Sequence, residues 1–333
     1  MAMDTSTLES LPPPPGVVGS LKAGFDAIAS HFMVILLPLA LDLWLWLGPH
    51  LSLENFFKPI LADFSRIAGA GGVPVADIDN ALKIYGTLFH GFNLFSMLRT
   101  FPIGIFSLMT GRMPLETPFG EMTIWQVSTA PSLLASLLGL TLAGWLGGGL
   151  FFYWVSAIVT PAQDDRIRSV QAVLQTVFFS LVWVVVSFIL IMPVMLVIYL
   201  LFALSPSLAQ GVLLFLGFLS MWLLVPLFFS PHGIFVKKQN ALVSIVNGLR
   251  MARFTLPTSS MFVLSAFLLG IGLNFLWSVP PEDSWMMLVG IFGHAFVTTA
   301  LLAASFIYYR DMNAWLEVAL DRFKTNNAAR RQT

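Results

Sequence analysis

Ionisable side chains inside long apolar stretches are the residues of this chain that could do chemistry. The clearest is Asp42, which lies in the run Leu41-Asp-Leu-Trp-Leu-Trp, about one turn before Gly48-Pro49. Burying a carboxylate in a bilayer is costly, so such a residue is a candidate for a cation or proton site, facing His50 or Arg99. The ordinary alternative is an interfacial carboxylate that anchors the helix end at the headgroup level, which the neighbouring tryptophans would mark.

His294 and Asn274 complete the candidate intramembrane polar site. His294 lies near the middle of the last apolar stretch, where Gly290 and Gly293 would let a neighbouring helix approach closely. Asn274 is its natural partner because the Pro280-Pro281 turn brings the two stretches together, although their predicted depths differ by about 9 Å. The alternative is that both residues are polar contacts between helices, and a single histidine cannot build a metal site.

Glycines form a third recognisable pattern. Gly144 and Gly148 are separated by three residues within an apolar stretch, and this spacing typically marks close helix packing. The cluster is not a phosphate-binding loop, because no strand is expected before it and no lysine follows it. The chain has no cysteine, which excludes disulfides, thiolate catalysis and cysteine-ligated metals. We therefore expect no cofactor, no metal site and no catalytic residue.

The elements that position these residues are predicted to be transmembrane helices. No Lys, Arg, Asp or Glu occurs in the 64 residues from Ala172 to Phe235, whereas one crossing of the hydrocarbon core needs only about 20 apolar residues. Charged residues make up 10% of the chain, against about 25% of a typical soluble domain. We expect an all-α, polytopic bundle of six spans, at Ala27–Leu47, Ser132–Val159, Ala172–Leu204, Gln210–Phe235, Ser259–Val279 and Trp285–Tyr309.

The distribution of Lys and Arg predicts the orientation of these spans. With the N-terminus inside, 12 of the 17 basic residues lie on the cytoplasmic side, and the two short outer turns, 205–207 and 280–283, contain none. The other five lie in the long segment between the first two spans. By the positive-inside rule, both termini are expected in the cytoplasm. The 17 basic residues are balanced by 17 acidic ones, so the chain has no net positive charge that would attract nucleic acid.

The segment 48–131 departs from a plain bundle. Apolar residues recur at helical spacing in two stretches that are too polar to span, and Gly69–Gly72 with Pro74 separate them. We expect an outer helical cap there, in which Phe101–Met109 could dip into the bilayer as a re-entrant segment. The predicted divisions are a disordered proline-rich cytoplasmic tail (1–18), an interfacial helix and first span (19–47), the cap (48–131), three spans (132–235), an interfacial helix and two spans (236–309), and a cytoplasmic tail helix (310–333).

A faint internal repeat accompanies the spans. Ser20 and Gly24 precede the first span and Ser244 and Gly248 precede the fifth, while a weaker third copy begins at Ser169. Each pair belongs to a short amphipathic helix that enters a span, as an interfacial helix would. For the helix from Asn240 to Arg253, the apolar face is predicted to hold Leu242, Ile245, Val246, Leu249 and Ala252, with Asn240, Ser244, Asn247 and Arg250 opposite or on its flank.

In the Asn240–Arg253 helix, the two spans after it and the exit Tyr308-Tyr309-Arg310-Asp311, the chain resembles a broad group of bacterial six-span proteins. The group includes the YciC-like and glycerophosphodiesterase-membrane-domain-like families, in which cytoplasmic amphipathic helices with small residues precede transmembrane hairpins. The stretch Pro38–Pro49 is also similar to uncharacterised membrane proteins of environmental bacteria. The resemblance, carried mainly by the C-terminal third, implies a bacterial plasma (inner) membrane protein and transfers no functional residue.

The expected function is that of a non-enzymatic membrane component, either an accessory or scaffold subunit or a lipid-interacting protein. The sequence offers no intramembrane charge pair, no polar pathway and no catalytic constellation. Membrane lipids are the expected partners, with other membrane protein subunits as further candidates. The alternative is a transporter or permease subunit for an apolar or weakly polar substrate, which would use spans kinked at Pro38, Pro193 and Pro226 together with Asp42 or His294.

Overall fold

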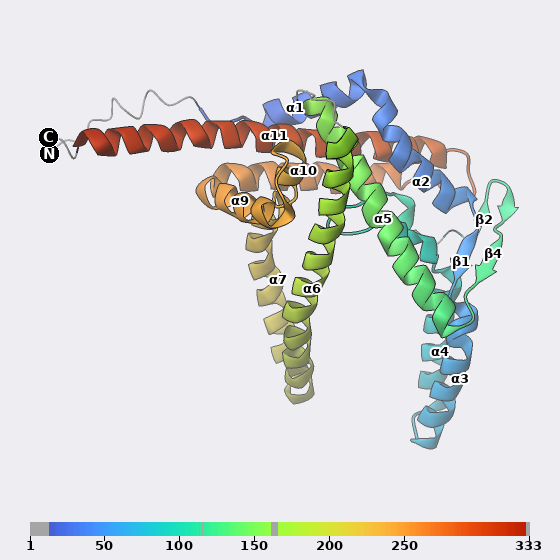
Figure 1. The fold of residues 1–333 in the computed structure, drawn as a ribbon. Coiled ribbons are helices and arrows are strands. Elements are labelled where there is room, and N and C mark those ends of the chain that lie inside the picture. Colours follow the sequence, from blue (N-terminus) through green and yellow to red (C-terminus); the bar gives the residue numbers. More distant parts are fainter. Residues whose placement is uncertain (1–12, 113, 115, 161–165, 331–333) are drawn as a thin grey trace. The chain divides into compact units, whose positions relative to one another are not determined.

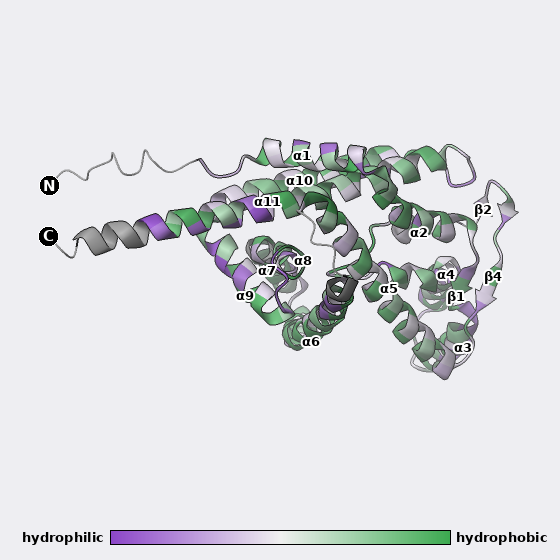
Figure 2. Cartoon of the chain, turned by 45° about the horizontal axis from the view of Figure 1, so that its top comes forward, coloured by the Kyte–Doolittle hydropathy of each residue, from purple (hydrophilic) through white to green (hydrophobic). Residues whose placement is uncertain are grey.

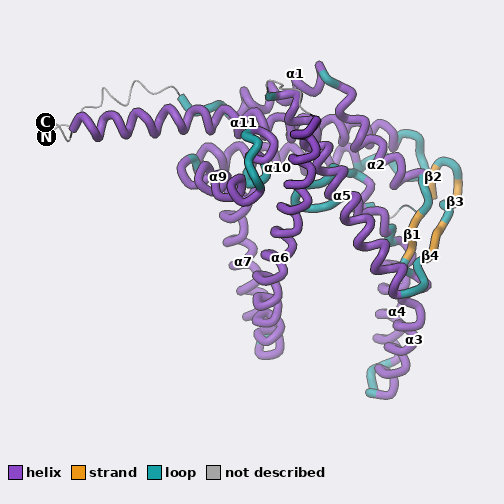
Figure 3. The backbone as a smooth tube through the Cα atoms, viewed as in Figure 1, coloured by secondary structure: helices purple, strands orange, loops and turns teal. Residues whose placement is uncertain are grey.

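The computed structural model describes residues 13–112, 114, 116–160 and 166–330, and most of these are helical (Figures 1 and 3). The all-α class predicted from the sequence is confirmed. The helices are α1 (Val17–Ser30), α2 (Leu36–Leu47), α3 (Glu54–Ala70), α4 (Val75–Gly91), α5 (Ala130–Val159), α6 (Arg166–Leu204), α7 (Pro206–Phe228), α8 (His232–Val236), α9 (Ala241–Phe254), α10 (Leu256–Trp277) and α11 (Met287–Arg330). The predicted tail at 1–18 lies largely outside the described residues, which begin at Pro13.

Four helices in the described part of the chain are long and apolar enough to cross a membrane. They are Ala130–Val159, Ser169–Leu204, Leu256–Trp277 and Met287–Arg322, and they coincide with the second, third, fifth and sixth predicted spans. The number rises to six if each of two bent helix pairs forms one span. Beyond the last predicted span, α11 continues without a break to Arg330.

The two bent pairs fall on the first and fourth predicted spans. Val17–Ser30 meets Phe32–Leu47 at 93°, so the predicted span Ala27–Leu47 is not one helix. The break lies at His31, and Pro38, where a kink was expected, lies inside α2. The part after the break has about 16 residues, or about 24 Å at 1.5 Å per residue. In the other pair, Pro206–Ser220 and Val225–Val236 meet at 49°, next to Pro226, whose missing N–H weakens the helix there.

Two compact units divide the chain, and several helices run through both. Unit 1 holds residues 1–31, 152–270 and 300–333, and unit 2 holds residues 32–151 and 271–299. The core of unit 1 packs the start of α10 and the middle of α11 against α9 and the residue after α7. Its fully buried rings include Phe229, Phe262 and Tyr308, and the Phe262 and Tyr308 rings stack with centroids 4.3 Å apart.

The Ser-x-x-x-Gly pairs of unit 1 lie where its helices meet. Ser20 and Gly24 of α1 are buried, and a Cβ on Gly24 would stand 2.5 Å from the backbone nitrogen of Ala304 in α11. Ser244 and Gly248 of α9 are also buried, and a Cβ on Gly248 would stand 2.8 Å from the Cα of Ser230. The small residues therefore permit close approach of backbone to backbone at both places.

The surface of α9 divides differently from the predicted pattern. Its buried side consists of small or flexible residues, namely Ala241, Ser244, Gly248, Met251 and Ala252. Leu242, Val246 and Leu249 are exposed instead, with 55%, 62% and 40% of their surface accessible. The prediction that Ser244 belongs to a polar flank was wrong, because its hydroxyl donates to the buried carbonyl of Ser230 at 2.6 Å.

Helices α6 and α7 form a long antiparallel hairpin within unit 1 (Figure 1). Ser205 separates them, and Pro206 opens α7, where a proline suits the first turn because its missing N–H needs no partner. Figure 2 colours both helices as hydrophobic along most of their length. The most apolar window of α6 has no buried residue, and Phe188, Ile189 and Leu190 are all more than 60% exposed.

Unit 2 contains the segment 48–131, and the strands of the described chain all lie there (Figure 3). Strand β1 (His50–Ser52) pairs in parallel with β4 (Ile124–Gln126), and β2 (Glu116–Thr117) pairs with β3 (Gly120–Glu121). Helices α3 and α4 form a hairpin whose turn, 71–74, falls at the predicted glycine–proline break. The expected apolar face of α3 is largely exposed, as at Ile60, Phe64 and Ile67.

Candidate functional site

The candidate site is built in unit 2 around an irregular stretch of backbone, residues 99–112, which we call the buried loop. It follows the short 3-10 helix η3 (Leu94–Leu98) and ends with the single turn η4 (Met109–Gly111). Most of its apolar side chains are buried, with Ile103 at 0% and Met109 at 2% exposure, whereas Phe101 is 69% exposed. Backbone that is neither helix nor strand leaves polar groups unpaired, so each wall of this loop must supply hydrogen bonds or close contacts.

Asp42 supplies the hydrogen bonds from α2. Its carboxylate is completely buried and accepts from the Ser107 hydroxyl at 2.5 Å and from the backbone N–H groups of Leu108 and Met109 at 3.0 Å each. The Ser107 hydroxyl also accepts from the Thr110 N–H at 3.1 Å. Asp42 thereby caps η4 from outside that helix, in the way that a side-chain acceptor caps the first N–H groups of any helix.

No basic side chain of the described residues forms an ion pair with Asp42. His50, one of its predicted partners, makes no hydrogen bond to it, whereas Arg99 is close enough for its charge to act on the carboxylate. Both carboxylate oxygens are occupied by O–H or N–H donors. The arrangement holds backbone in place and leaves little capacity for binding a cation.

The glycines of α5 form the opposite wall of the buried loop. A Cβ on Gly144 would stand 2.7 Å from the Leu98 carbonyl oxygen and 2.5 Å from the Thr100 methyl group. A Cβ on Gly148 would stand 2.6 Å from the Cα of Gly104. The predicted close contact therefore exists, but these glycines face the loop and the end of η3, not another long helix.

Arg112 and Trp46 tie the end of the loop and of α2 to the turn after α10. The Arg112 guanidinium donates to the carbonyls of Ser278 and Pro280 and forms an ion pair with Glu282 at 3.3 Å. The indole N–H of Trp46 donates to the Glu282 carbonyl at 2.7 Å. These contacts satisfy backbone carbonyls of the turn that follows α10, which lie outside any helix.

His294 and Asn274 do not join each other by a hydrogen bond among the described residues. His294 is 8% exposed, and its Nε2 atom is buried without a hydrogen-bond partner. The glycines before it do permit close packing, since a Cβ on Gly293 would stand 2.6 Å from the indole ring of Trp277. Trp277 at the end of α10 thus approaches both glycines, with its ring at Gly293 and with its backbone carbonyl at Gly290.

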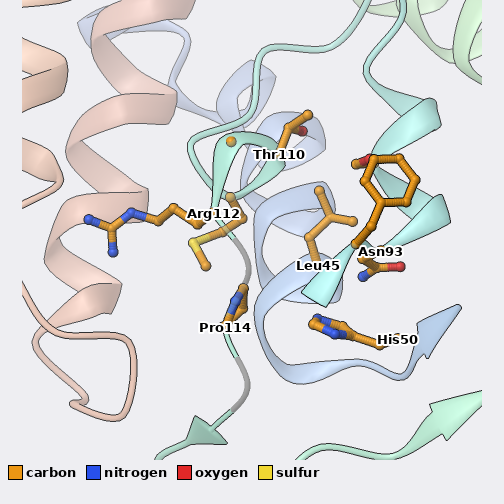
Figure 4. A pocket seen from close by; sticks show the side chains of 10 residues that line it. Leu45, His50, Asn93, Thr110, Arg112 and Pro114 are labelled. Atoms are coloured by element: carbon orange, nitrogen blue, oxygen red, sulfur yellow. The ribbon is translucent and has the colours of Figure 1, made fainter. Parts of the chain in front are cut away.

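A small pocket opens beside the buried loop, next to η4 (Figure 4). Its volume is about 120 Å³, and its lining combines apolar and polar side chains: Leu45, His50, Phe92, Asn93, Ser96, Met109, Thr110, Gly111, Arg112 and Pro114. The Nε2 atom of His50 and the hydroxyl of Thr110 are buried and have no hydrogen-bond partner among the described residues. Burial, followed by the nearby His90, lowers the pKa of His50 below 6.5, so its ring is neutral at pH 7.

A second buried polar cluster, around His232, lies in unit 1. His232 is 2% exposed, and its Nε2 atom lies 2.8 Å from the Ser305 hydroxyl of α11. The rings of Phe229, Phe306 and Tyr309 surround it. The sequence could not predict this contact, because it joins α8 to α11, which lie far apart along the chain, and no residue spacing indicates that they pack together.

The described residues contain no group of three or more His, Asp or Glu side chains arranged to hold a metal ion. Comparisons of the chain with protein-family models, with curated proteins and with solved structures found no match.

Proposed function

We propose that this chain is a multi-pass protein of the bacterial plasma membrane that works without catalysis, as a lipid-interacting or scaffold component. In this proposal it has six spans, so each bent helix pair crosses the bilayer, and both termini are cytoplasmic. The four long apolar helices support membrane insertion. The Lys and Arg distribution supports the orientation.

The observation that supports the lipid-interacting role is the composition of the exposed side of α9, the side that faces away from the core of unit 1. Leu242, Val246 and Leu249 follow one another at helical spacing on its exposed side, and the small residues of the opposite side pack on unit 1. Arg250 and Arg253 are exposed on the same outward side, and no described acidic side chain pairs with them. An apolar stripe with unpaired arginines suits an anionic lipid surface, where the leucines enter the acyl region and the arginines meet the headgroups.

The α6–α7 hairpin supports the same proposal. Its side chains are apolar all round and exposed over the length of one membrane crossing, as at Phe188, Leu200 and Phe215. Water would make such a surface aggregate, whereas lipid chains solvate it without cost. The hairpin therefore offers its surface to acyl chains or to helices of another membrane subunit.

The transporter alternative has less support from the candidate site. Both carboxylate oxygens of Asp42 accept hydrogen bonds from the buried loop. His294 forms no ion pair among the described residues. A transport pathway for charged solutes normally needs free ionisable groups inside the membrane.

Lipid retention in native mass spectrometry tests the proposal. The protein is extracted in mild detergent from vesicles containing equal amounts of phosphatidylglycerol and phosphatidylcholine. Wild type is expected to retain the anionic lipid preferentially, and the double variant Arg250→Gln/Arg253→Gln should lose most of that preference. Arg66→Gln, which removes an exposed arginine paired with Asp63 on α3, is the matched control. Equal retention by the double variant and wild type would remove the basis for the proposed role of α9.

A further inference from the structure

The buried loop starts and finishes at the same end of the helices of unit 2. Just before it, Asn93 accepts a hydrogen bond at 3.1 Å from the backbone N–H of Leu51, in the strand that follows α2. At its end, Arg112 pairs with Glu282 in the turn between α10 and α11. Trp46, in the last turn of α2, donates to the carbonyl of the same Glu282. Both ends of the loop therefore lie where α2 finishes and α10 turns into α11.

Between these ends the loop reaches the middle of α5 (Figure 3). A Cβ on Gly144 would stand 2.7 Å from the Leu98 carbonyl oxygen, and a Cβ on Gly148 would stand 2.6 Å from the Cα of Gly104. Gly148 precedes the last residue of α5, Val159, by 11 residues, which is about 16 Å at ~1.5 Å per residue. That distance is about half of the ~30 Å hydrocarbon core that α5 would cross.

The backbone of the loop meets the condition for irregular structure at membrane depth. Such backbone is tolerated inside a bilayer only where protein surrounds it or water fills the space beside it. Ile103, Ile105 and Leu108 are 7% exposed or less, and the Thr100 hydroxyl donates to the Ile103 carbonyl at 2.7 Å. Asp42 accepts from the N–H groups near the other end of the loop. The loop is therefore built as a re-entrant segment is, going in and returning on one side.

Two side chains near the deep part of the loop face outward instead. Phe101 is 69% exposed, and Arg99 is also exposed. The Arg99 guanidinium forms no hydrogen bond or ion pair within the described part of the chain, although its charge acts on Asp42 and His294 from a distance. An arginine at membrane depth without a bonded anion is costly, and the Asp42 oxygens are already taken up by the loop.

We propose that residues 99–104 are the tip of a re-entrant segment, and that Arg99 there binds the phosphate group of one phospholipid while Phe101 contacts its acyl chains. A guanidinium pairs with two phosphate oxygens at once, which makes phosphate a favourable anion for it. Gly144, beside Arg99, precedes Val159 by 15 residues, or about 22 Å. Arg99 then starts about 8 Å below the far boundary of a ~30 Å core, and a long side chain can extend toward that boundary.

The side of entry rests on the six-span arrangement proposed above, which makes it the outer side, whereas the depth of the tip and the phosphate contact do not. The tip belongs to unit 2 and the proposed lipid face of α9 belongs to unit 1. Each proposal can therefore fail without the other.

A nitroxide spin label attached to a single introduced cysteine tests the depth, since the chain has no cysteine of its own. In phosphatidylcholine nanodiscs, the label at Phe101→Cys should collide more often with oxygen, which concentrates among acyl chains, than with a water-soluble nickel chelate. Glu121→Cys, at an exposed position of β3, is the control and should show the opposite order. Nickel collisions at Phe101→Cys as frequent as those at Glu121→Cys would overturn the re-entrant placement.

Native mass spectrometry tests the phosphate contact, with protein extracted in mild detergent from phosphatidylcholine vesicles. Arg99→Gln should retain one phospholipid fewer than wild type, and Arg99→Lys, which keeps the charge, should retain it. Arg66→Gln, at an exposed ion pair on α3, and the α9 variant Arg250→Gln/Arg253→Gln should both keep this lipid. Equal retention by wild type and Arg99→Gln would overturn the proposed site.

Calorimetric titration of inorganic phosphate into lipid-stripped protein separates a phospholipid from a free anion. Wild type and Arg99→Gln should give the same weak, unsaturated heats, because the acyl chains that hold the phosphate at the tip are missing. Saturable phosphate binding that is lost in Arg99→Gln, together with unchanged lipid retention, would show a site for a free anion and overturn the assignment to a lipid.

Discussion

A buried carboxylate can hold a cation or hold backbone, and its hydrogen-bond donors decide between the two. The sequence identified Asp42 as the residue to examine because a charge in an apolar stretch is costly. It could not reveal the donors, since Ser107, Leu108 and Met109 lie more than 60 residues away along the chain. Their positions depend on the path of the buried loop, which has no periodic pattern to read.

The role of Asp42 predicts a loss of stability, not of a specific activity, in Asp42→Asn. The amide would place an N–H₂ group against at least one backbone N–H, leaving buried donors unpaired at a cost of about 1–3 kcal/mol. The thermal unfolding midpoint in detergent and the folded yield should both fall, while Asp63→Asn, at an exposed ion pair on α3, should change neither appreciably. An Asp42→Asn protein with wild-type stability would show that the loop does not depend on this carboxylate.

His50 predicts how stability depends on pH. Its pKa in the folded protein lies below 6.5, so the unfolded chain binds more protons on acidification and stability falls as pH drops below about 6.5. Above that pH the ring is neutral in both states and contributes no slope. The titratable group that acts on it is His90, whose Nδ1 atom lies 2.8 Å from Glu54, and Arg112 lines the same pocket.

The measurement compares unfolding midpoints of wild type and His50→Phe from pH 8 to pH 5. The variant should lose less stability across this range, because the titration of His50 is gone. Curves that stay parallel at every pH would mean that His50 is not buried in its neutral form.

At the scale of elements, small residues set the approach distances. Their spacing was visible in the sequence: Gly144 with Gly148, Ser20 with Gly24, and Ser244 with Gly248 are all at close contacts. The segments that contact these residues could not be predicted, because the spacing of small residues indicates only that another segment packs closely there. The helix boundaries were largely predictable from apolar runs, whereas the 93° break at His31 has no proline or glycine beside it that would predict it.

Two glycines on α5 provide a direct comparison of packing with helix propensity. In Gly148→Ala the new methyl group would stand 2.6 Å from the Cα of Gly104, and such overpacking against backbone costs about 1–3 kcal/mol. In Gly139→Ala nothing lies within 4 Å of the new Cβ, so the gain in helix propensity of about 0.5–1 kcal/mol is realised. Thermal unfolding should place the first variant below wild type and the second at or above it. Equal midpoints for the two would show that the buried loop does not press on α5.

At the scale of the whole molecule, topology depends on whether each bent helix pair crosses the bilayer. Composition and charge distribution predict six crossings, and the described helices alone establish four candidates. The side on which the loop between α6 and α7 lies shows whether the first bent pair crosses. If it crosses, the segment 48–131 is outside, and the two crossings α5 and α6 bring the chain back to the same side. With the N-terminus inside, six spans put this loop outside the cell.

Because the chain has no cysteine, a single introduced thiol reports the side of the membrane unambiguously. Ser207→Cys, at an exposed position of α7, should react with a membrane-impermeant maleimide on intact cells. Lys22→Cys, at an exposed position of α1, should react only after permeabilisation, since the start of α1 is the cytoplasmic end of the first bent helix pair in the six-span arrangement. Labelling of both thiols from outside, or of Ser207→Cys only after permeabilisation, would contradict six spans with both termini inside. The expected pair of results would place the basic face of α9 at the cytoplasmic leaflet, where anionic lipids are available to it.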